Sequence, residues 1–230
     1  SPLRISYALG MTYNGAAGDT KAEMAACMNL ESLPLQEVNS SFQYLTEALM
    51  NVDEKVHMEI ANSIWYRKSF QVQDDFIQTN SKYYHALVSS LDFSSPDASS
   101  TINNWVSDAT NGKIDRIVGQ ISPLVMMFLI NAIYFKGHWR HEFEKNKTTG
   151  QVFYLRNGEE VQVPTMQVES KFRYFENDYC SAVEMPYGRG NFSMVLMLPE
   201  ENLQPEDVIS QLASGASLSE ELEQAESTRV

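Results

Sequence analysis

Residues 124–137 read LVMMFLINAIYFKG, and this stretch decides the fold. The run is almost wholly apolar, which predicts a long buried strand over Leu124–Phe135. A single amide, Asn131, lies near its middle. Burying that amide costs free energy unless both of its ends are hydrogen-bonded. We interpret Asn131 either as a latch that holds something shut or as a satisfied core asparagine that fixes strand register. The first interpretation favours a protein that changes conformation over a catalyst.

Upstream of this strand, the sequence is dominated by predicted helices. The first begins with Ser1 as N-cap and Pro2 as its first residue, and it ends before Asn14-Gly15. The spacing of Thr20 and Glu23 is that of a capping box. Apolar periodicity predicts further helices over 38–49, 76–84 and 102–109, the last closed by Gly112. Strict alternation predicts a strand over 58–66, and residues 86–93 are expected to be extended.

Downstream of the strand, the pattern is that of antiparallel hairpins. Asn157-Gly158 is a strong turn signal between 152–155 and 161–163. A second hairpin is predicted to pair 180–186 with 192–198, followed by a helix from Pro205 and the start of a strand at Thr228. Because helices cluster early and antiparallel strands cluster late, without an alternating βαβ rhythm, the predicted fold class is α+β.

The charge balance narrows the choice of partners. The chain of 230 residues has 17 basic and 30 acidic side chains, which gives a formal net charge of -13. Nucleic acid and anionic membranes both require a basic face, so neither is expected as a partner. The longest apolar run is also too short to span a bilayer, so no membrane insertion is expected. The length suits one large domain or two small ones.

No catalytic or cofactor motif stands out. A nucleophile elbow and a P-loop are both missing from the sequence, and Gly188 with Gly190 lacks the third glycine of a dinucleotide motif. His138 and His141 lie beside acidic residues, but a surface loop is a simpler interpretation than a metal site. We therefore expect no cofactor, no metal and no enzymatic activity. Two further sets of residues have structural interpretations. Cys27 and Cys180 are interpreted as buried thiols, with a disulfide as the alternative. Met126, Met127, Met194 and Met197 are interpreted as core filling in place of a ligand surface.

Six separated segments together resemble the serpin family, and the likeness covers nearly the whole chain. None of them is specific alone, but they follow one another in the order of that family. Their residues resemble prokaryotic serpins more than vertebrate plasma serpins. The segments are Ser1–Leu3 with Gly15–Ala16 and Gly18–Met24, Asn62–Tyr66, Ile102–Val106 with Thr110–Ile114, Asn131–Gly137 with Trp139, Val163–Met166, and Glu184–Gly188 with Phe192–Met194.

The resemblance implies a serpin-like α+β fold, multi-helical with large mixed and antiparallel sheets, of which residues 1–230 form a single partial domain. It implies a suicide inhibitor whose exposed reactive loop is cleaved by a serine, or sometimes a cysteine, protease. The cleaved loop then inserts as a new strand into the large sheet of a metastable native fold. The predicted strand over Leu124–Phe135 would flank the insertion slot. Ser1 and Asn131 match the family's shutter under the centre of this slot, and Trp139 matches the breach at its top.

Arg4 departs from the family, which usually has a small hydroxyl residue at this position, one helical turn from Ser1. One interpretation is that the arginine buries its charge or displaces the helix, which would loosen the latch. The other places Arg4 on the surface of a locally shifted helix. The resemblance also leads us to expect that the first helix of the family, its reactive loop with the scissile bond and its last core strands are absent. Residues 1–230 alone are then expected to fold poorly or to associate.

Two classes of function are kept open by the resemblance. The first is protease inhibition by the whole protein, and its rival is a non-inhibitory serpin that acts as a carrier, a chaperone or an interaction protein. The helix predicted around Val38–Val52 contains Glu47 and no basic residue, so activation by polyanions is not expected. The expected location is extracellular or periplasmic.

Overall fold

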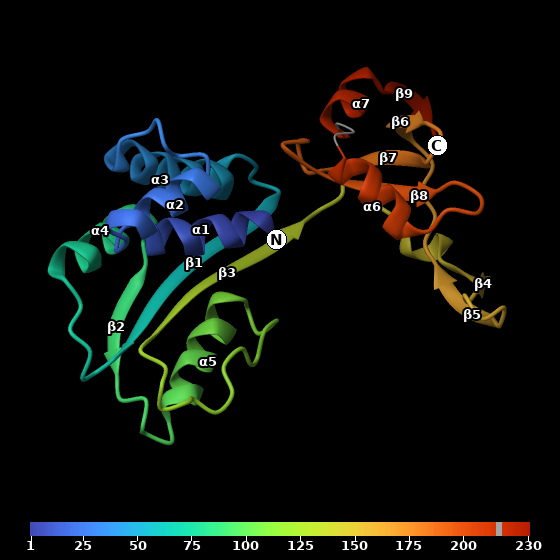
Figure 1. Ribbon diagram of the computed structural model, residues 1–230. Coiled ribbons are helices and arrows are strands. Elements are labelled where there is room, and N and C mark those ends of the chain that lie inside the picture. Colours follow the sequence, from blue (N-terminus) through green and yellow to red (C-terminus); the bar gives the residue numbers. More distant parts are fainter. Residues whose placement is uncertain (215–217) are drawn as a thin grey trace. The chain divides into compact units, whose positions relative to one another are not determined.

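The computed structural model describes residues 1–214 and 218–230 (Figure 1). These residues fall into two compact units, one made of Ser1–Val52 and His57–Lys136, the other of Asp53–Val56 and Gly137–Val230. The elements follow in the order α1 (Pro2–Tyr13), α2 (Gly18–Cys27), α3 (Leu35–Asn51), β1 (Val56–Arg67), α4 (Asp74–Tyr84), β2 (Leu87–Leu91), α5 (Ala98–Ala109), β3 (Met127–Gly137), a 3-10 turn (Lys145–Lys147), β4 (Thr149–Tyr154), β5 (Glu160–Thr165), β6 (Lys171–Glu176), β7 (Cys180–Tyr187), β8 (Phe192–Pro199), α6 (Pro205–Ala213), α7 (Leu218–Gln224) and β9 (Glu226–Arg229).

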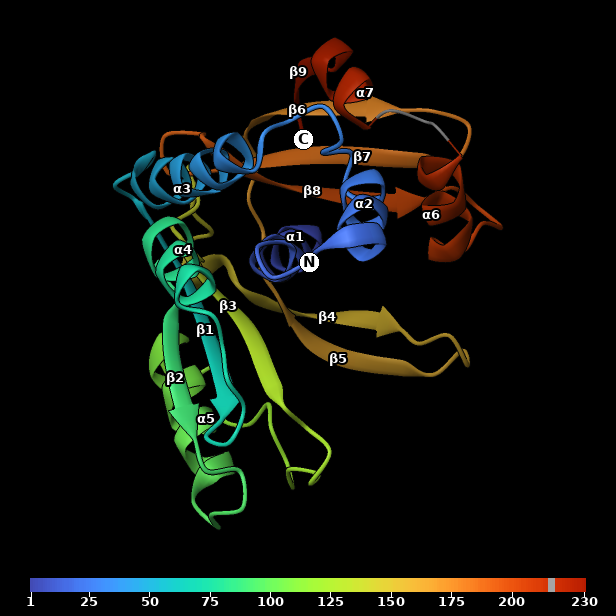
Figure 2. The same ribbon diagram turned by 60° about the vertical axis from the view of Figure 1, so that its left-hand side comes forward.

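The first unit is built on a three-stranded sheet in the order β2-β1-β3. Strands β1 and β2 pair in parallel, with Ser63 opposite Leu87. Helix α5 lies along this sheet in both ribbon views (Figures 1 and 2). The side chains between them form an apolar core around the buried indole of Trp65. Its other buried members are Phe93, Ile102, Val106, Val118 and Ile130.

Strand β3 begins later than its sequence predicts. The apolar run starts at Leu124, but the strand starts at Met127, and the Leu124 side chain is 85% exposed. A turn at Ser122 accounts for the difference, since the backbone amide of Val125 donates to the Ser122 carbonyl at 3.0 Å and the amide of Leu124 to the Ser122 hydroxyl at 3.3 Å. Hydrogen bonding by Ser122 therefore competes with strand pairing at this end.

Two helix predictions need correction. Helix α2 begins at Gly18 with Ala17 as its N-cap, so Thr20 and Glu23 lie inside the helix and do not form the predicted capping box. In α3 the predicted apolar stripe does not hold at Leu45, whose side chain is 38% exposed. Thr46 is buried in its place, because its hydroxyl reaches the phenol of Tyr7 on α1.

The second unit contains two separate sheets. Strands β4 and β5 form the predicted antiparallel hairpin, and β7 and β8 form the second one. The larger sheet has the order β8-β7-β6-β9. Strand β6 was not predicted, although Phe172 and Tyr174 alternate with basic residues there. It pairs with β7 on one side and with β9 on the other.

Several side chains predicted to be buried are not. Cys180 is buried but Cys27 is exposed, and both thiols are free, so the alternative of a disulfide between them is also wrong. Met126 and Met194 are 47% and 39% exposed, which contradicts their interpretation as core filling. Met126 lies outside β3, and Met194 lies on β8, an edge strand of the larger sheet.

Candidate functional site

A chain of amides crosses from β3 to β1 and on to α4. The Asn131 side-chain amide donates to Oδ1 of Asn62 at 2.8 Å, and Nδ2 of Asn62 donates to the backbone carbonyl of Tyr84 at 2.7 Å. Asn62 is 2% exposed, and Tyr84 is fully buried at the end of α4. Oδ1 of Asn131 is buried without a partner among the described residues. One end of the Asn131 amide thus ties neighbouring strands together, while the other end is unsatisfied.

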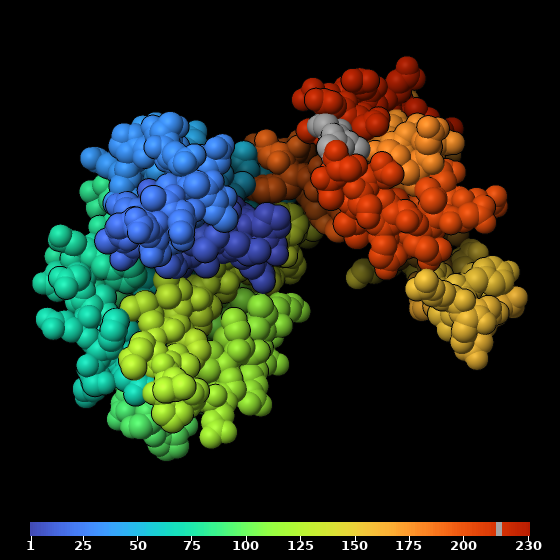
Figure 3. Space-filling view, viewed as in Figure 1, coloured from blue at the N-terminus to red at the C-terminus, as the bar shows by residue number. Residues whose placement is uncertain are grey.

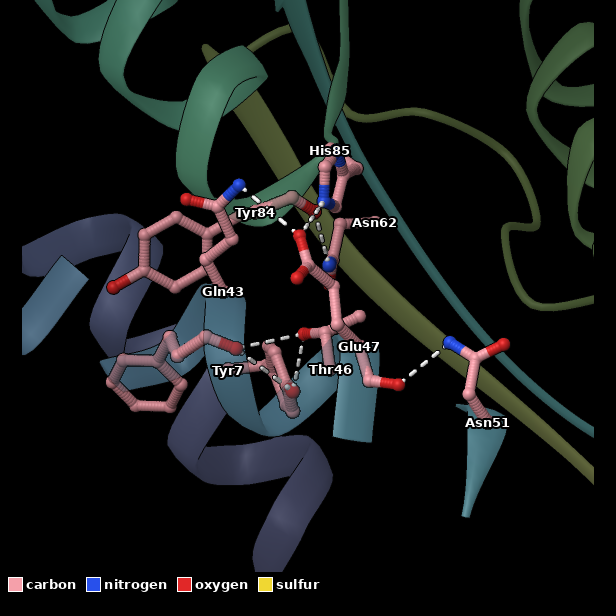
Figure 4. A network of polar contacts seen from close by, with 9 residues as sticks. Tyr7, Gln43, Thr46, Glu47, Asn51, Asn62, Tyr84 and His85 are labelled. Atoms are coloured by element: carbon pink, nitrogen blue, oxygen red, sulfur yellow. Dashed lines mark hydrogen bonds and ion pairs between the residues drawn. The ribbon is translucent and has the colours of Figure 1, made fainter. Parts of the chain in front are cut away.

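A second polar contact holds helices α1 and α3 together. The phenol of Tyr7 on α1 lies 2.6 Å from the hydroxyl of Thr46 on α3, and that hydroxyl donates to the Phe42 carbonyl at 2.9 Å (Figure 4). Burial raises the pKa of the Tyr7 phenol, and the hydrogen bond to Thr46 opposes this only in part. Tyr7 therefore stays neutral and fixes α1 against α3. Figure 4 also shows Asn62 reaching the backbone of Tyr84.

Ser1 and Arg4 lie at the start of α1 and differ in their burial and hydrogen bonding. Ser1 is the N-cap, as its sequence predicts, but it is exposed and its side chain makes no capping bond. Arg4 is half-buried, and its Nη2 donates to the backbone carbonyl of Ile133 on β3 at 2.8 Å. Its Nε is buried without a partner among the described residues. The arginine, and not the serine, connects α1 to the strand that carries Asn131.

Trp139 lies in the second unit, where it stacks on Tyr187. The two ring centroids are 4.2 Å apart and the rings are inclined by 15°. An isolated bridge joins the two backbones, and the ring of Phe143 meets the indole edge-on at 6.2 Å. Gly137 allows this arrangement, because a Cβ atom there would lie 2.7 Å from Cδ1 of Tyr187. An aromatic cluster thus fixes the end of β7 beside Trp139.

Asp53 forms a buried polar centre in the same unit that sequence reasoning missed. Its carboxylate accepts hydrogen bonds from the backbone amides of Arg189 at 2.7 Å and Lys55 at 3.0 Å. Burial raises the pKa of the Asp53 carboxyl, but these bonds, the Asn191 amide and the Arg189 charge outweigh burial and hold the pKa below its ordinary value. Gly188 has a φ of +44°, and a Cβ atom there would lie 2.6 Å from the carboxylate. The charged form of Asp53 therefore ties the β7–β8 turn to Asp53–Val56.

The remaining features of the described residues concern metal ligands, the histidines and long apolar helices. No group of three or more histidine, cysteine or acidic side chains among them could hold a metal ion. His141 contacts the hydroxyl of Ser170 at 3.0 Å, and His138 lies in the segment after β3, as the sequence predicts. Within residues 1–214 and 218–230, no helix is both long enough and apolar enough to cross a membrane.

The chain belongs to the serpin family, described as "Serpin (serine protease inhibitor)", whose match covers residues 1–230. A serpin-like protein of Methanosarcina acetivorans is 33% identical over 208 residues, which are 88% of this chain and 48% of that protein. The leukocyte elastase inhibitor of Bos taurus is 34% identical over 207 residues, which are 87% of this chain and 54% of the inhibitor. The chain thus spans about half the length of the curated relatives it matches.

Solved serpins share the fold. The native state of tengpin, a thermophilic serpin, matches 100% of this chain and 58% of its own with a TM-score of 0.87 and 32% identity. Reactive-loop-cleaved human thyroxine binding globulin matches 100% of this chain and 69% of its own with a TM-score of 0.90 and 28% identity. The α+β serpin-like fold class and the family resemblance are therefore confirmed.

The predicted site residues divide between the two units. Asn131 lies in the first unit with Ser1, but no described hydrogen bond links the hydroxyl of Ser1 to it. Trp139 belongs to the second unit. The shutter and breach assignments of these three residues stay predictions. Asn62 was given no role from sequence, although a polar residue in the apolar strand 58–66 is the same signal that singled out Asn131.

Proposed function

We propose that the protein carrying this chain inhibits serine proteases by the serpin mechanism, in which a cleaved loop is added as a strand beside β3. The observation that carries the proposal is the position of β3 at one edge of the β2-β1-β3 sheet, with Asn131 tying it to Asn62 on the neighbouring strand. An edge strand offers free backbone groups for strand addition. The Asn131–Asn62 bond would act as the shutter, because separating the strands breaks it.

The relatives support this proposal. Two of them, from Bos taurus and Homo sapiens, are named leukocyte elastase inhibitors and are 34% and 33% identical to this chain. Tengpin has been solved in a native and in a latent state, so that serpin adopts more than one conformation. For this protein we propose a serine protease as the partner, with a cysteine protease as the alternative. We also propose an extracellular or periplasmic location.

The experiment is a trapping assay on the longest gene product that contains residues 1–230. It is incubated with trypsin-, chymotrypsin-, elastase- and subtilisin-like proteases, and denaturing gels are read for a complex that survives boiling. A stable covalent complex with one of them is the expected result. Cleavage without a complex, and without a gain in thermal stability afterwards, would contradict inhibition by strand insertion. A catalytically inactive variant of the protease is the control, because it cannot form the acyl bond.

A carrier function is the second candidate, and one pocket favours it. A cavity of about 390 Å³ in the first unit is lined mainly by apolar side chains, among them Met24, Phe76 and Leu129. Its volume lies in the range of small-molecule sites. Thyroxine binding globulin, by its name a protein that binds thyroxine, has the same fold. Thyroxine itself serves as the probe in a fluorescence titration. Saturable binding that Phe76→Ser abolishes would favour the carrier function, and no binding would remove it.

A further inference from the structure

One edge of β3 pairs with no other strand of the described residues, and we call it the free edge. The backbone carbonyls of β3 point alternately toward β1 and toward this free edge. Strand β3 lies at the end of the β2-β1-β3 order, and in Figure 3 the yellow-green segment that includes it reaches the surface of the first unit. The backbone amide of Arg67 on β1 donates to the Met126 carbonyl at 2.8 Å, so that carbonyl points toward β1. Successive carbonyls of an extended chain point to opposite edges. The carbonyl of Ile133, seven residues further on, therefore points to the free edge.

The side chain of Arg4 is hydrogen-bonded to this carbonyl. Its guanidinium donates from Nη2 to Ile133 O at 2.8 Å, across 129 positions of sequence. A hydrogen bond from a charged donor is stronger than one between neutral groups. Because Nε of Arg4 is buried without a partner among the described residues, the bond to Ile133 is the contact that holds this half-buried cation in place.

The pocket beside Arg4 has no acceptor of opposite charge among its described lining residues. Arg4 and Ile133 line a pocket of about 560 Å³ together with Lys113 and Lys136, and no carboxylate is among its lining residues in the described chain. Moving the guanidinium deeper into this pocket would bring it toward like charges. To release the Ile133 carbonyl, the arginine must therefore move out toward solvent.

We propose that Arg4 is a positioning residue that caps the edge of β3 and slows the addition of a strand there. The inference rests on the proposed function, since it concerns the edge to which the inserted strand would be added. An added strand needs the Ile133 carbonyl as an acceptor, so the Arg4 bond must break before pairing reaches this point. In this proposal the bond would tighten the site, whereas one of the two interpretations of Arg4 from the sequence has the arginine loosen the latch.

The test uses the longest gene product that contains residues 1–230, with an acetylated, fluorescein-labelled peptide of six Thr-Ala repeats as the strand probe. Association is followed by fluorescence anisotropy in wild type, Arg4→Ser, Arg4→Lys and Lys136→Gln. Arg4→Ser is expected to associate roughly tenfold faster than wild type, as the loss of one charge-assisted hydrogen bond predicts. Arg4→Lys should lie between the two. Lys136→Gln removes a charge from the same pocket without uncapping Ile133 and should match wild type within about twofold.

The outcomes separate this inference from the proposed function. Hydrogen exchange locates the probe, because the amides of Asn131 and Ile133 become protected when a strand pairs with this edge. Protection with equal rates in wild type and Arg4→Ser would overturn the role of Arg4 and leave strand addition standing. An equal acceleration by Lys136→Gln would also overturn it, since charge alone would then explain the effect. A probe that protects neither amide in any variant would reject strand addition at β3, and the inference with it.

A measurement on the wild type alone covers the case in which Arg4→Ser does not fold. The guanidinium resonances of Arg4 are recorded by ¹⁵N NMR with and without the peptide. Release of the Ile133 carbonyl should shift these resonances and speed exchange of the Arg4 protons with water. Amide protection at Ile133 without any change at Arg4 would contradict the cap.

Discussion

The side-chain amide of Asn131 on β3 donates a 2.8 Å hydrogen bond to Oδ1 of Asn62 on β1. Asn62 in turn donates to the Tyr84 carbonyl, so its removal takes a partner from that buried carbonyl and from the half-buried amide of Asn131. Each such group costs about 1–3 kcal/mol. We therefore expect Asn62→Ala to lower the free energy of unfolding of the first unit by about 3 kcal/mol, measured by urea denaturation.

The matched control for this prediction is Asn51→Ala. Asn51 also donates through Nδ2 to a backbone carbonyl, that of Glu47 at 2.7 Å, but on the exposed side of α3. Its removal should change the free energy of unfolding by less than about 0.5 kcal/mol. Equal losses in the two variants would mean that burial of the Asn62 amide is not what makes it important.

Gly137→Ala tests the packing of Tyr187 beside Trp139. The added Cβ atom would lie 2.7 Å from Cδ1 of Tyr187, so the ring must move and its stack on Trp139 must open. Overpacking of this kind costs about 1–3 kcal/mol. The expected result is a red-shifted tryptophan emission and a lower unfolding midpoint. Gly150→Ala, whose Cβ atom would lie an ordinary 3.5 Å from Oε1 of Gln162, should leave both unchanged.

Local sequence patterns were sufficient to predict most elements of the fold. The apolar periodicity of α3, the turn residues Asn157-Gly158 and the apolar run of β3 each depend on near neighbours in the chain, and each led to the correct element. The boundaries were less accurate, as the start of α2 at Gly18 and of β3 at Met127 shows. At β3, two hydrogen bonds to Ser122 in the flanking turn account for the later start.

The contacts that make up the candidate site were harder to predict. The bond from Arg4 to Ile133 and the bonds from Arg189 to Asp53 join residues more than a hundred positions apart. Nothing near Arg4 in the sequence distinguishes a surface arginine from one that bonds a distant strand. Asp53 likewise has the neighbours of an ordinary loop carboxylate, and only the glycine-containing turn at Gly188 gives it a buried environment.

Acid should weaken the second unit through Asp53. The folded-state pKa of this carboxyl lies below its ordinary value of 3.8, so its stabilising contribution is complete above that value and is lost as the pH falls through the folded pKa. We expect Asp53→Asn to lower the unfolding midpoint at neutral pH, and the gap from wild type to close as the pH falls below 3.8. Glu54→Gln, which removes an exposed partner of Arg189, should have a small effect without this acid dependence. A gap that persists in acid would contradict the role of the Asp53 charge.

The two cysteines should differ sharply in reactivity. Cys27 is exposed at the end of α2, whereas Cys180 is buried at the start of β7. Burial raises the pKa of the Cys180 thiol, and the nearby charges of Glu221 and Glu200 add to the effect, so less of it is present as the reactive thiolate. Ellman's reagent at pH 8 should therefore label one thiol per native chain at once and the second only in denaturant. Cys27→Ser should remove the fast phase entirely. A fast phase that survives in this variant would show that Cys180 opens to solvent in the native protein.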